Sequence, residues 1–257
     1  MSKKPAAKKK STKKAIAKKA AKKAPASKSS DFPFTLPQVD ASAKRRARRL
    51  RDLLAEHYPD AHCELDFSAP HELLIATILS AQCTDVAVNK ATPALFKKFP
   101  TPADYAKASP EAIEPYVKTL GFFRNKAKSV HAAMSAVVSE FGGQVPSTME
   151  ELLTLRGVAR KTANVVLSNA FGINNGFVVD THVMRLSRRL GLIDKDEEGD
   201  PVKIEKKLMA LFAREDWGLL SHLMIFHGRR ACKARMASCA DHPVCRKFGE
   251  CCELPRG

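Results

Sequence analysis

The chain has 257 residues, 44% of them hydrophobic, so it is long enough to bury a core without disulfide staples. Its formal net charge is +17 and its isoelectric point is near 9.7, which favours a polyanionic partner such as nucleic acid. No apolar stretch approaches the roughly 18 residues of a membrane span, and the N-terminus has no apolar signal core. The composition therefore excludes a membrane-spanning protein and predicts a soluble, intracellular one.

The positive charge is concentrated at the N-terminus. Residues 1–30 hold 12 Lys and no acidic residue, so this segment accounts for 12 of the 17 net charges. Lys, Ala, Ser and Pro dominate it and cannot bury enough surface to offset the entropy of ordering. Residues 1–40 are therefore predicted to be a disordered Lys-rich tail. We expect it to raise non-specific DNA affinity by releasing counterions, while a solubility tail and a nuclear address remain the alternatives.

From about residue 41 onward the sequence predicts one helix after another. The stretch 41–58 has apolar residues at helical spacing and basic residues on the other face. A second apolar run begins at Pro70, with Ser68 in its N-cap region. Further helix starts are predicted at Thr101-Pro102, Ser109-Pro110, Ser147-x-x-Glu150 and Asp200-Pro201. No period-two alternation bounded by hairpin turns is present, so the predicted fold is all-α, with about ten short helices.

A glycine-containing turn opens directly into a helix in the segment 155–163, which reads Leu-Arg-Gly-Val-Ala-Arg-Lys-Thr-Ala. Such a helix start leaves backbone N–H groups unpaired, and these suit a phosphate oxygen. The segment resembles the hairpin of a helix-hairpin-helix DNA-binding element. The contact implied by this resemblance does not depend on DNA sequence, and an ordinary helix start after a glycine turn is the alternative.

A second motif makes the resemblance specific. Residues 178–186 read Val-Val-Asp-Thr-His-Val-Met-Arg-Leu, and a hairpin Lys followed by an Asp in a V-D-T-H segment is typical of endonuclease III glycosylases with lyase activity. The segments 80–85, 121–127 and 226–229 are also similar to that family. The similarity covers roughly residues 42–252, so the chain outside the tail resembles the endonuclease III family as a whole.

The resemblance implies that Lys161 is the nucleophile and Asp180 its acidic partner. An amine attacks only when neutral, and Arg160 together with the N-terminus of the following helix would disfavour the ammonium form of the lysine. Attack at the sugar C1′ would expel the base and leave an imine that permits β-elimination. Asp180 would stabilise the developing positive charge or shuttle protons. Taken alone, however, an Asp before an apolar helix is often an N-cap, and a lysine there is as often a phosphate contact.

Such an enzyme must extrude the target nucleotide and fill the gap that it leaves. The resemblance assigns this filling to Gln82 and Phe122, although Phe122 stands where the family usually has an aliphatic residue. Packing in the core is the alternative for both Phe122 and Phe123. The full DNA-binding set implied is Gln82, Phe122, Arg156, Gly157, Ala159 and Arg160, and the implied pocket residues are Phe123, Asp85 and His182.

Three further positions depart from the family. Phe123 replaces a usual Tyr and so removes a hydroxyl from the implied pocket, which bears on base preference. Arg156 replaces a usual Pro, and Ala159 a usual Gly. If position 159 requires a left-handed backbone, Ala there costs about 1 kcal/mol.

Cysteine usage predicts a metal site. Five of the seven Cys fall in the last 26 residues, a density that in an intracellular protein indicates metal more often than disulfides. The family pattern C-x6-C-x2-C-x5-C supplies four thiolates to a 4Fe–4S cluster. The resemblance implies the ligands Cys232, Cys239, Cys245 and Cys251, with a middle gap three residues longer than in the family. Cys252 is an alternative fourth ligand, and structural zinc is an alternative metal.

The resemblance also implies a two-lobed architecture with a DNA groove between the lobes. Residues 63–173 would form a six-helix barrel domain that includes the hairpin, while residues 41–62 and 174–257 would form the iron–sulfur cluster domain. The first helix would thus return to pack with the C-terminal half, and Lys161 and Asp180 would face each other across the groove.

The predicted function is that of a bifunctional DNA glycosylase and AP lyase of base excision repair, which removes oxidised pyrimidines and cleaves the abasic strand. The expected partner is double-stranded DNA with a damaged base or abasic site, bound by a monomer. The expected location is the bacterial cytoplasm, on the nucleoid, or the nucleus in a eukaryote. A monofunctional glycosylase, an adenine-mismatch glycosylase and a non-catalytic DNA-binding protein are the alternatives.

Overall fold

The computed structural model describes residues 32–235 and 241–250. Most of the predicted tail, Cys239, Cys251 and Cys252 therefore lie outside the described residues. The described part is all-helical, as predicted, with no strand. Its helices are α1 (Ala41–His57), α2 (Pro70–Leu79), α3 (Asp85–Lys98), α4 (Pro102–Lys107), α5 (Pro110–Val117), α6 (Phe123–Phe141), α7 (Met149–Thr154), α8 (Arg160–Ala170), α9 (Thr181–Arg189), α10 (Pro201–Leu211), α11 (Trp217–Arg230) and α12 (Pro243–Phe248), with short 3-10 turns η1 (Lys195–Glu197) and η2 (Arg214–Asp216).

Local sequence signals start most of these helices. Asp40 caps α1 by accepting a hydrogen bond from the Ala43 amide at 2.8 Å, and Asp200 caps α10 in the same way. Thr101 forms a capping box with Asp104 at the start of α4. The start predicted at Ser147 is wrong by one residue, because Thr148 is the N-cap of α7.

Helices α2 to α8 share one hydrophobic core, which runs from Leu65 to Val178. At its centre lies α2, in which all residues from Leu73 to Leu79 are buried. A helix that is apolar on every side must be surrounded by other helices. It packs against α3, α6 and α8, while α6 also packs against α4 and α5.

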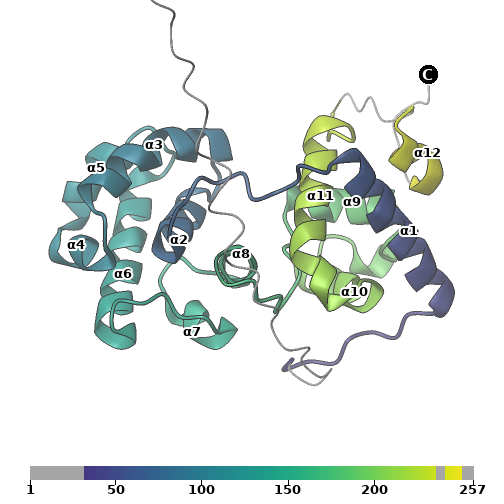
Figure 1. The fold of residues 1–257 in the computed structure, drawn as a ribbon, viewed down its shortest axis with the longest axis horizontal. Coiled ribbons are helices and arrows are strands. Elements are labelled where there is room, and N and C mark those ends of the chain that lie inside the picture. The colour runs from purple at the N-terminus through teal and green to yellow at the C-terminus, as the bar shows by residue number, and fades with distance from the viewer. Residues whose placement is uncertain (1–31, 236–240, 251–257) are drawn as a thin grey trace, which may run out of the picture. The chain divides into compact units, whose positions relative to one another are not determined.

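A second group of helices forms around α11, which packs against α1 and α9. Figure 1 shows α1 beside the helices at the C-terminal end of the chain and not beside α2, which follows it in sequence. The side chain of Arg46 on α1 accounts for part of this placement, since it donates to the carbonyl oxygens of Leu190 at 2.8 Å and Phe248 at 2.9 Å. Trp217 and Phe226, both on α11, are buried.

The two groups are joined along α8 and α11. His222 Nε2 on α11 lies 2.9 Å from Asn169 Oδ1 on α8, and α8 packs against both α2 and α11. The first turn of α8 also contacts the second group, because Arg160 on α8 pairs with Glu205 on α10.

Candidate active site

The predicted hairpin is a tight turn between α7 and α8. Gly157 has a φ of +83°, in the left-handed region that glycine adopts without a steric penalty. A Cβ at this residue would also lie 3.1 Å from the Cβ of Ser129. Ala159, the N-cap of α8, is extended with a φ of −96°. The left-handed backbone conformation of this turn is adopted by Gly157 and not by Ala159. The steric cost that Ala159 would have in that conformation therefore does not arise.

Lys161 is the second residue of α8 and its side chain is exposed. It lines a cleft of about 1110 Å³, which is large enough to admit a nucleotide. Its neighbour Arg160 points elsewhere and forms an ion pair of 2.7 Å with Glu205, a carboxylate only 5% exposed. Glu205 also accepts from Asn164 at 2.9 Å. The guanidinium expected to act on Lys161 as a neighbouring cation is therefore already paired.

Asp180 is the N-cap of α9. Its Oδ1 accepts a hydrogen bond of 2.8 Å from the Val183 amide, which confirms the capping interpretation. The same residue lines the cleft that contains Lys161. A carboxylate has acceptor capacity beyond one hydrogen bond, so capping leaves it able to interact with a positive centre in the cleft.

Three other predicted residues, Gln82, Asp85 and His182, also line this cleft. Burial lowers the pKa of His182, while the nearby charge of Asp180 opposes this shift. The cleft lining includes neither Phe122 nor Phe123. Phe123 packs against the core of α2 to α8, and the guanidinium of Arg124 lies 5.0 Å from its ring centroid. The remaining predicted DNA-binding residues, Arg156, Gly157, Ala159 and Arg160, lie on the hairpin that leads to Lys161.

Gln82 and Phe122 share an unusual backbone conformation. Among the non-glycine residues that the structure describes, only these two have a positive φ, 56° and 57° respectively. A left-handed conformation costs an L-residue about 1–2 kcal/mol and is typical of functional positions. Phe122 is also 68% exposed, whereas large apolar side chains are usually buried. Both residues are thus held in strained, outward positions.

A partly buried hydrogen bond joins the segments that contain these two strained positions. Lys126, on the first turn of α6 after Phe122, donates from Nζ to Sγ of Cys83 at 2.8 Å. Cys83 directly follows Gln82 in the chain, and Lys126 is only 6% exposed. This contact links the segment before α3 to the start of α6. Neither residue was assigned a role from the sequence.

The cleft lining also contains two charged residues that were not predicted as site residues, Arg229 and Glu64. Arg229 on α11 forms ion pairs with Glu64 and with Asp85, the latter at 2.7 Å. The segment 226–229 contributed to the family resemblance, but nothing in the sequence pairs its arginine with Glu64. We refer to Arg229, Glu64 and Asp85 as the Arg229 cluster.

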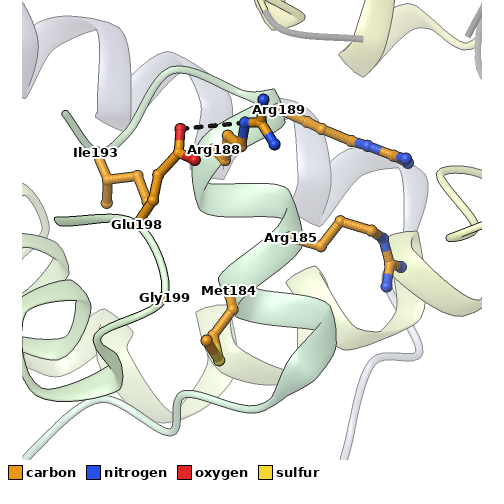
Figure 2. Close-up of a pocket in the computed structure, with 7 residues that line it drawn as sticks. All are labelled: Met184, Arg185, Arg188, Arg189, Ile193, Glu198 and Gly199. Atoms are coloured by element: carbon orange, nitrogen blue, oxygen red, sulfur yellow. Dashed lines mark ion pairs between the residues drawn. The ribbon is translucent and has the colours of Figure 1, made fainter. Parts of the chain in front are cut away.

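A smaller hollow of about 300 Å³ lies along α9, with Met184 shared between it and the cleft. Figure 2 shows the side chains around it, with Arg188 turned toward Glu198, to which it forms an ion pair of 3.1 Å. Arg185 and Arg189 extend to the other side of the helix. They donate to Cys232, Arg185 to its carbonyl oxygen at 3.0 Å and Arg189 to its Sγ at 3.3 Å. The hollow contains neither Lys161 nor Asp180, so the cleft is the better candidate.

Two of the predicted metal ligands approach each other beside α11. Sγ of buried Cys232, Sγ of Cys245 and a ring nitrogen of His227 all lie within 4.8 Å of one another. Nε2 of His227 is 3.1 Å from Cys245 Sγ, and the hydroxyl of Tyr58 lies 2.9 Å from Nδ1 of the same ring. Two thiols and an imidazole at this spacing fit a metal centre that prefers soft ligands. The residues therefore fit a thiolate-bound metal group.

Known proteins are similar to this chain over most of its length. Residues 75–214 match the model of the HhH-GPD superfamily base excision DNA repair protein. Endonuclease III from Synechocystis sp. is 52% identical over 201 residues, covering 78% of this chain and 90% of that protein. A solved non-covalent endonuclease III–DNA complex has a TM-score of 0.75 at 43% identity, covering 80% of this chain and 94% of that one. A trapped covalent endonuclease III–DNA intermediate has a TM-score of 0.74 at 44% identity, covering 78% and 93%.

Proposed function

Because the chain belongs to the endonuclease III family of base-excision DNA glycosylases and abasic-site lyases, we propose that Lys161 is its nucleophile and that its substrates are oxidised pyrimidines in duplex DNA. The observation that carries this proposal is that Lys161 and Asp180, from the starts of two different helices, line one cleft. The solved complexes with DNA support a nucleic acid as the ligand of that cleft.

The chemistry follows from the two side chains. The neutral amine of Lys161 attacks C1′ of the extruded nucleotide, and the C1′–N bond breaks as the base leaves with the electron pair and takes up a proton. Asp180 stabilises the positive charge that develops on the sugar. The sugar ring opens and Lys161 is joined to C1′ as an imine, which acidifies the 2′ hydrogen. Transfer of this proton to a general base expels the 3′ phosphate and cleaves the strand.

The strained residues support a role in holding the duplex open. Gln82 lines the cleft, while exposed Phe122 is available to wedge into the base stack. The hairpin around Gly157 would bind phosphate through backbone N–H groups. Pairing of Arg160 with Glu205 favours a structural role for that guanidinium over a direct phosphate contact. Phe123 packs beside the core, and its missing hydroxyl is a candidate cause of altered base preference.

We also propose that the metal group is a 4Fe–4S cluster held by Cys232, Cys239, Cys245 and Cys251. The approach of Cys232 to Cys245 supports this set. Such a cluster would supply no step of the base-excision chemistry described here, and its ligands would hold the basic loop that contains Lys233 and Arg235 in place. Cys245→Ser is expected to lose absorbance near 400 nm, and retention of that absorbance would rule out this ligand.

Residues 63–173 would form the barrel domain and residues 41–62 with 174–257 the cluster domain. The packing of α1 against α10, α11 and α12 supports this division. No helix in the described part of the chain is long and apolar enough to cross a membrane. The relatives are bacterial, and we propose that the protein is a monomer that acts on nucleoid DNA in a bacterial cytoplasm.

Borohydride trapping tests the central proposal. Wild type, Lys161→Ala and the matched control Lys118→Ala, an exposed lysine outside the cleft, are each incubated with a duplex that carries one oxidised pyrimidine and with one that carries an abasic site. A covalent adduct with wild type and Lys118→Ala but not with Lys161→Ala is expected. No adduct from a wild type that binds the duplex would indicate a monofunctional glycosylase or a non-catalytic binder.

A further inference from the structure

Three aromatic side chains form a chain of hydrogen bonds that ends at one of the predicted metal ligands, Cys245. Tyr58 is the C-cap of α1, His227 lies on α11, and His242 is the N-cap of α12. The Tyr58 hydroxyl lies 2.9 Å from Nδ1 of His227 and 3.2 Å from Nε2 of His242. Nε2 of His227, a fully buried residue, lies 3.1 Å from Sγ of Cys245. We refer to Tyr58, His227 and His242 as the Tyr58 chain.

The direction of these hydrogen bonds follows from the end of the chain at α12. Burial lowers the pKa of both histidines, so their rings are neutral at neutral pH. A neutral imidazole has one N–H donor and one acceptor nitrogen. Nδ1 of His242 accepts from the Val244 amide at 3.3 Å, so its Nε2 carries the hydrogen and donates to the Tyr58 oxygen. The single hydroxyl hydrogen of Tyr58 is then directed to Nδ1 of His227, which leaves the Nε2–H of that ring to donate to Cys245.

The other end of the chain requires the same direction. A metal-bound cysteine is a thiolate, which has no hydrogen and can only accept. Nε2 of His227 must therefore donate to Cys245. In the reversed chain, an N–H of His242 would face the N–H of Val244, and a bare nitrogen would face an anionic sulfur. A backbone amide and a thiolate thus fix the direction independently.

The two described ligands accept from different kinds of donor. Sγ of Cys232 accepts from Nη1 of Arg189 at 3.3 Å, and the guanidinium nitrogens of arginine always carry hydrogen. The neutral ring of His227, in contrast, can present either an N–H or a bare nitrogen to Cys245. Its tautomer must be selected, and Tyr58 is the group that its other nitrogen contacts.

A hydrogen bond to a metal-bound thiolate has two measurable consequences. The N–H draws negative charge from the sulfur and stabilises the more reduced state, which raises the reduction potential of an iron–sulfur cluster. Loss of an oriented partner outside the ligand set typically weakens metal binding by about 10- to 100-fold. Both consequences depend on the tautomer and orientation of the His227 ring.

We propose that Tyr58 is a positioning residue for the metal group, because it holds His227 in the tautomer whose Nε2–H donates to the thiolate of Cys245. His242 and the Val244 amide set the direction of the Tyr58 chain. This inference rests on the proposed function, since it takes the metal group to be the iron–sulfur cluster bound by Cys245. It assigns no step of base excision to the Tyr58 chain.

The test compares holoproteins purified without oxygen. These are wild type, Tyr58→Phe, His227→Leu and the double variant. Tyr105→Phe is the matched control, because Tyr105 is a buried tyrosine of the other helix group whose hydroxyl has no hydrogen-bond partner among the described residues. Voltammetry gives the midpoint potential, and an iron chelator removes the metal while the absorbance at roughly 400 nm is followed. Thermal unfolding of every variant is measured in parallel.

Tyr58→Phe is expected to lower the midpoint potential and to speed the loss of absorbance to the chelator by about tenfold, because His227 loses the group that selects its tautomer. His227→Leu removes the donor itself and should have at least the same effect. In the His227→Leu background, Tyr58→Phe should change neither quantity further, since the hydroxyl acts only through the ring. Tyr105→Phe should match wild type in both.

Two results would overturn the inference. One is a wild-type potential and chelation rate in Tyr58→Phe, which with a lower melting temperature would make the hydroxyl a packing contact only. The other is an equal effect of Tyr58→Phe with and without His227. Because Tyr58→Phe removes a single oxygen atom, it decides the inference even where His227→Leu does not fold.

A failure of the proposed cluster gives a different result. Wild type that holds zinc and does not absorb at roughly 400 nm would contradict the cluster. Faster loss of zinc from Tyr58→Phe than from wild type would then still support the role of Tyr58, and equal rates would overturn it. Borohydride trapping by Lys161 does not involve the metal group, so failure of the base-excision proposal is detected separately.

Discussion

The cleft contains two groups of charged side chains that are positioned in different ways. Lys161 lies in the first turn of α8 and Asp180 caps α9, so the neighbouring backbone orients each of them. In the Arg229 cluster, the paired residues are 144 and 165 positions apart in the chain. Their contact depends on how α3 and α11 are brought together. Changes in helix packing should therefore disturb the ion pairs of the Arg229 cluster before they disturb the positions of Lys161 and Asp180.

The largest expected effect concerns Asp180, whose cap and charge can be separated. Asn is as good an N-cap as Asp, so Asp180→Asn should retain the stability of α9 while excision falls about 10²- to 10³-fold through loss of the charge. Asp180→Ala should lose the same activity and also about 1 kcal/mol in free energy of unfolding. Single-turnover excision and urea denaturation measure the two quantities. If Asp180→Asn excised the base at the wild-type rate, the role of Asp180 would be limited to capping α9.

The next largest effect is expected at His222, which joins α11 to α8 through its contact with Asn169. Burial lowers the pKa of His222 to about 4, so its ring is neutral in the folded protein at neutral pH. The unfolded chain takes up this proton below the ordinary pKa of about 6.5. The contribution of His222 to the free energy of unfolding is therefore complete above about pH 6.5. It is lost as the pH falls toward 4, and the free energy of unfolding decreases by on the order of 3 kcal/mol.

Urea denaturation across this pH range checks the effect. His222→Gln cannot titrate but can still donate to Asn169, so its stability should fall less steeply with acid than that of wild type. Parallel curves for the two proteins would show that His222 does not titrate as expected.

A smaller effect is expected at Phe122. Glycine adopts a positive φ freely, so Phe122→Gly should leave the free energy of unfolding unchanged or raise it by up to about 1 kcal/mol. Loss of the exposed ring should weaken binding to a duplex with an abasic site by about tenfold. Phe122→Leu, which restores the usual aliphatic residue, should recover most of this affinity in a fluorescence titration. Equal affinities for all three proteins would exclude a wedge.

The smallest effect is expected from removal of the tail, which should change DNA binding and not excision. Removal of residues 1–30 deletes 12 lysines, so log Kd for duplex DNA should depend less steeply on log salt, by about 0.9 for each phosphate the tail neutralises. Single-turnover excision at saturating enzyme should not change. An unchanged salt dependence would contradict the role of the tail as a DNA-binding arm.

The sequence predicted the all-helical fold correctly because its helix signals are local. Asp40, Thr101 and Asp200 act through hydrogen bonds within their own first turn. The error at α7 has the same origin, because Ser147-x-x-Glu150 and Thr148-x-x-Glu151 are overlapping capping patterns. Burial of Met149 and Leu152 accompanies the later start.

Motifs in the sequence were also sufficient to predict the family, which the relatives confirm. The site residues remain predictions, although Lys161, Asp180, Gln82, Asp85 and His182 line one cleft as their assignment requires. Phe123 does not line it.

The sequence by itself thus determined the helices, the glycine turn before α8 and the capping Asp180, because each depends on residues a few positions apart. Only the tertiary structure decided that Glu205 pairs with Arg160, that Lys126 reaches Cys83 and that Arg229 joins Glu64 to Asp85. These contacts join residues between 43 and 165 positions apart. At such separations the pairing is set by how whole helices pack, which no local pattern of residues encodes.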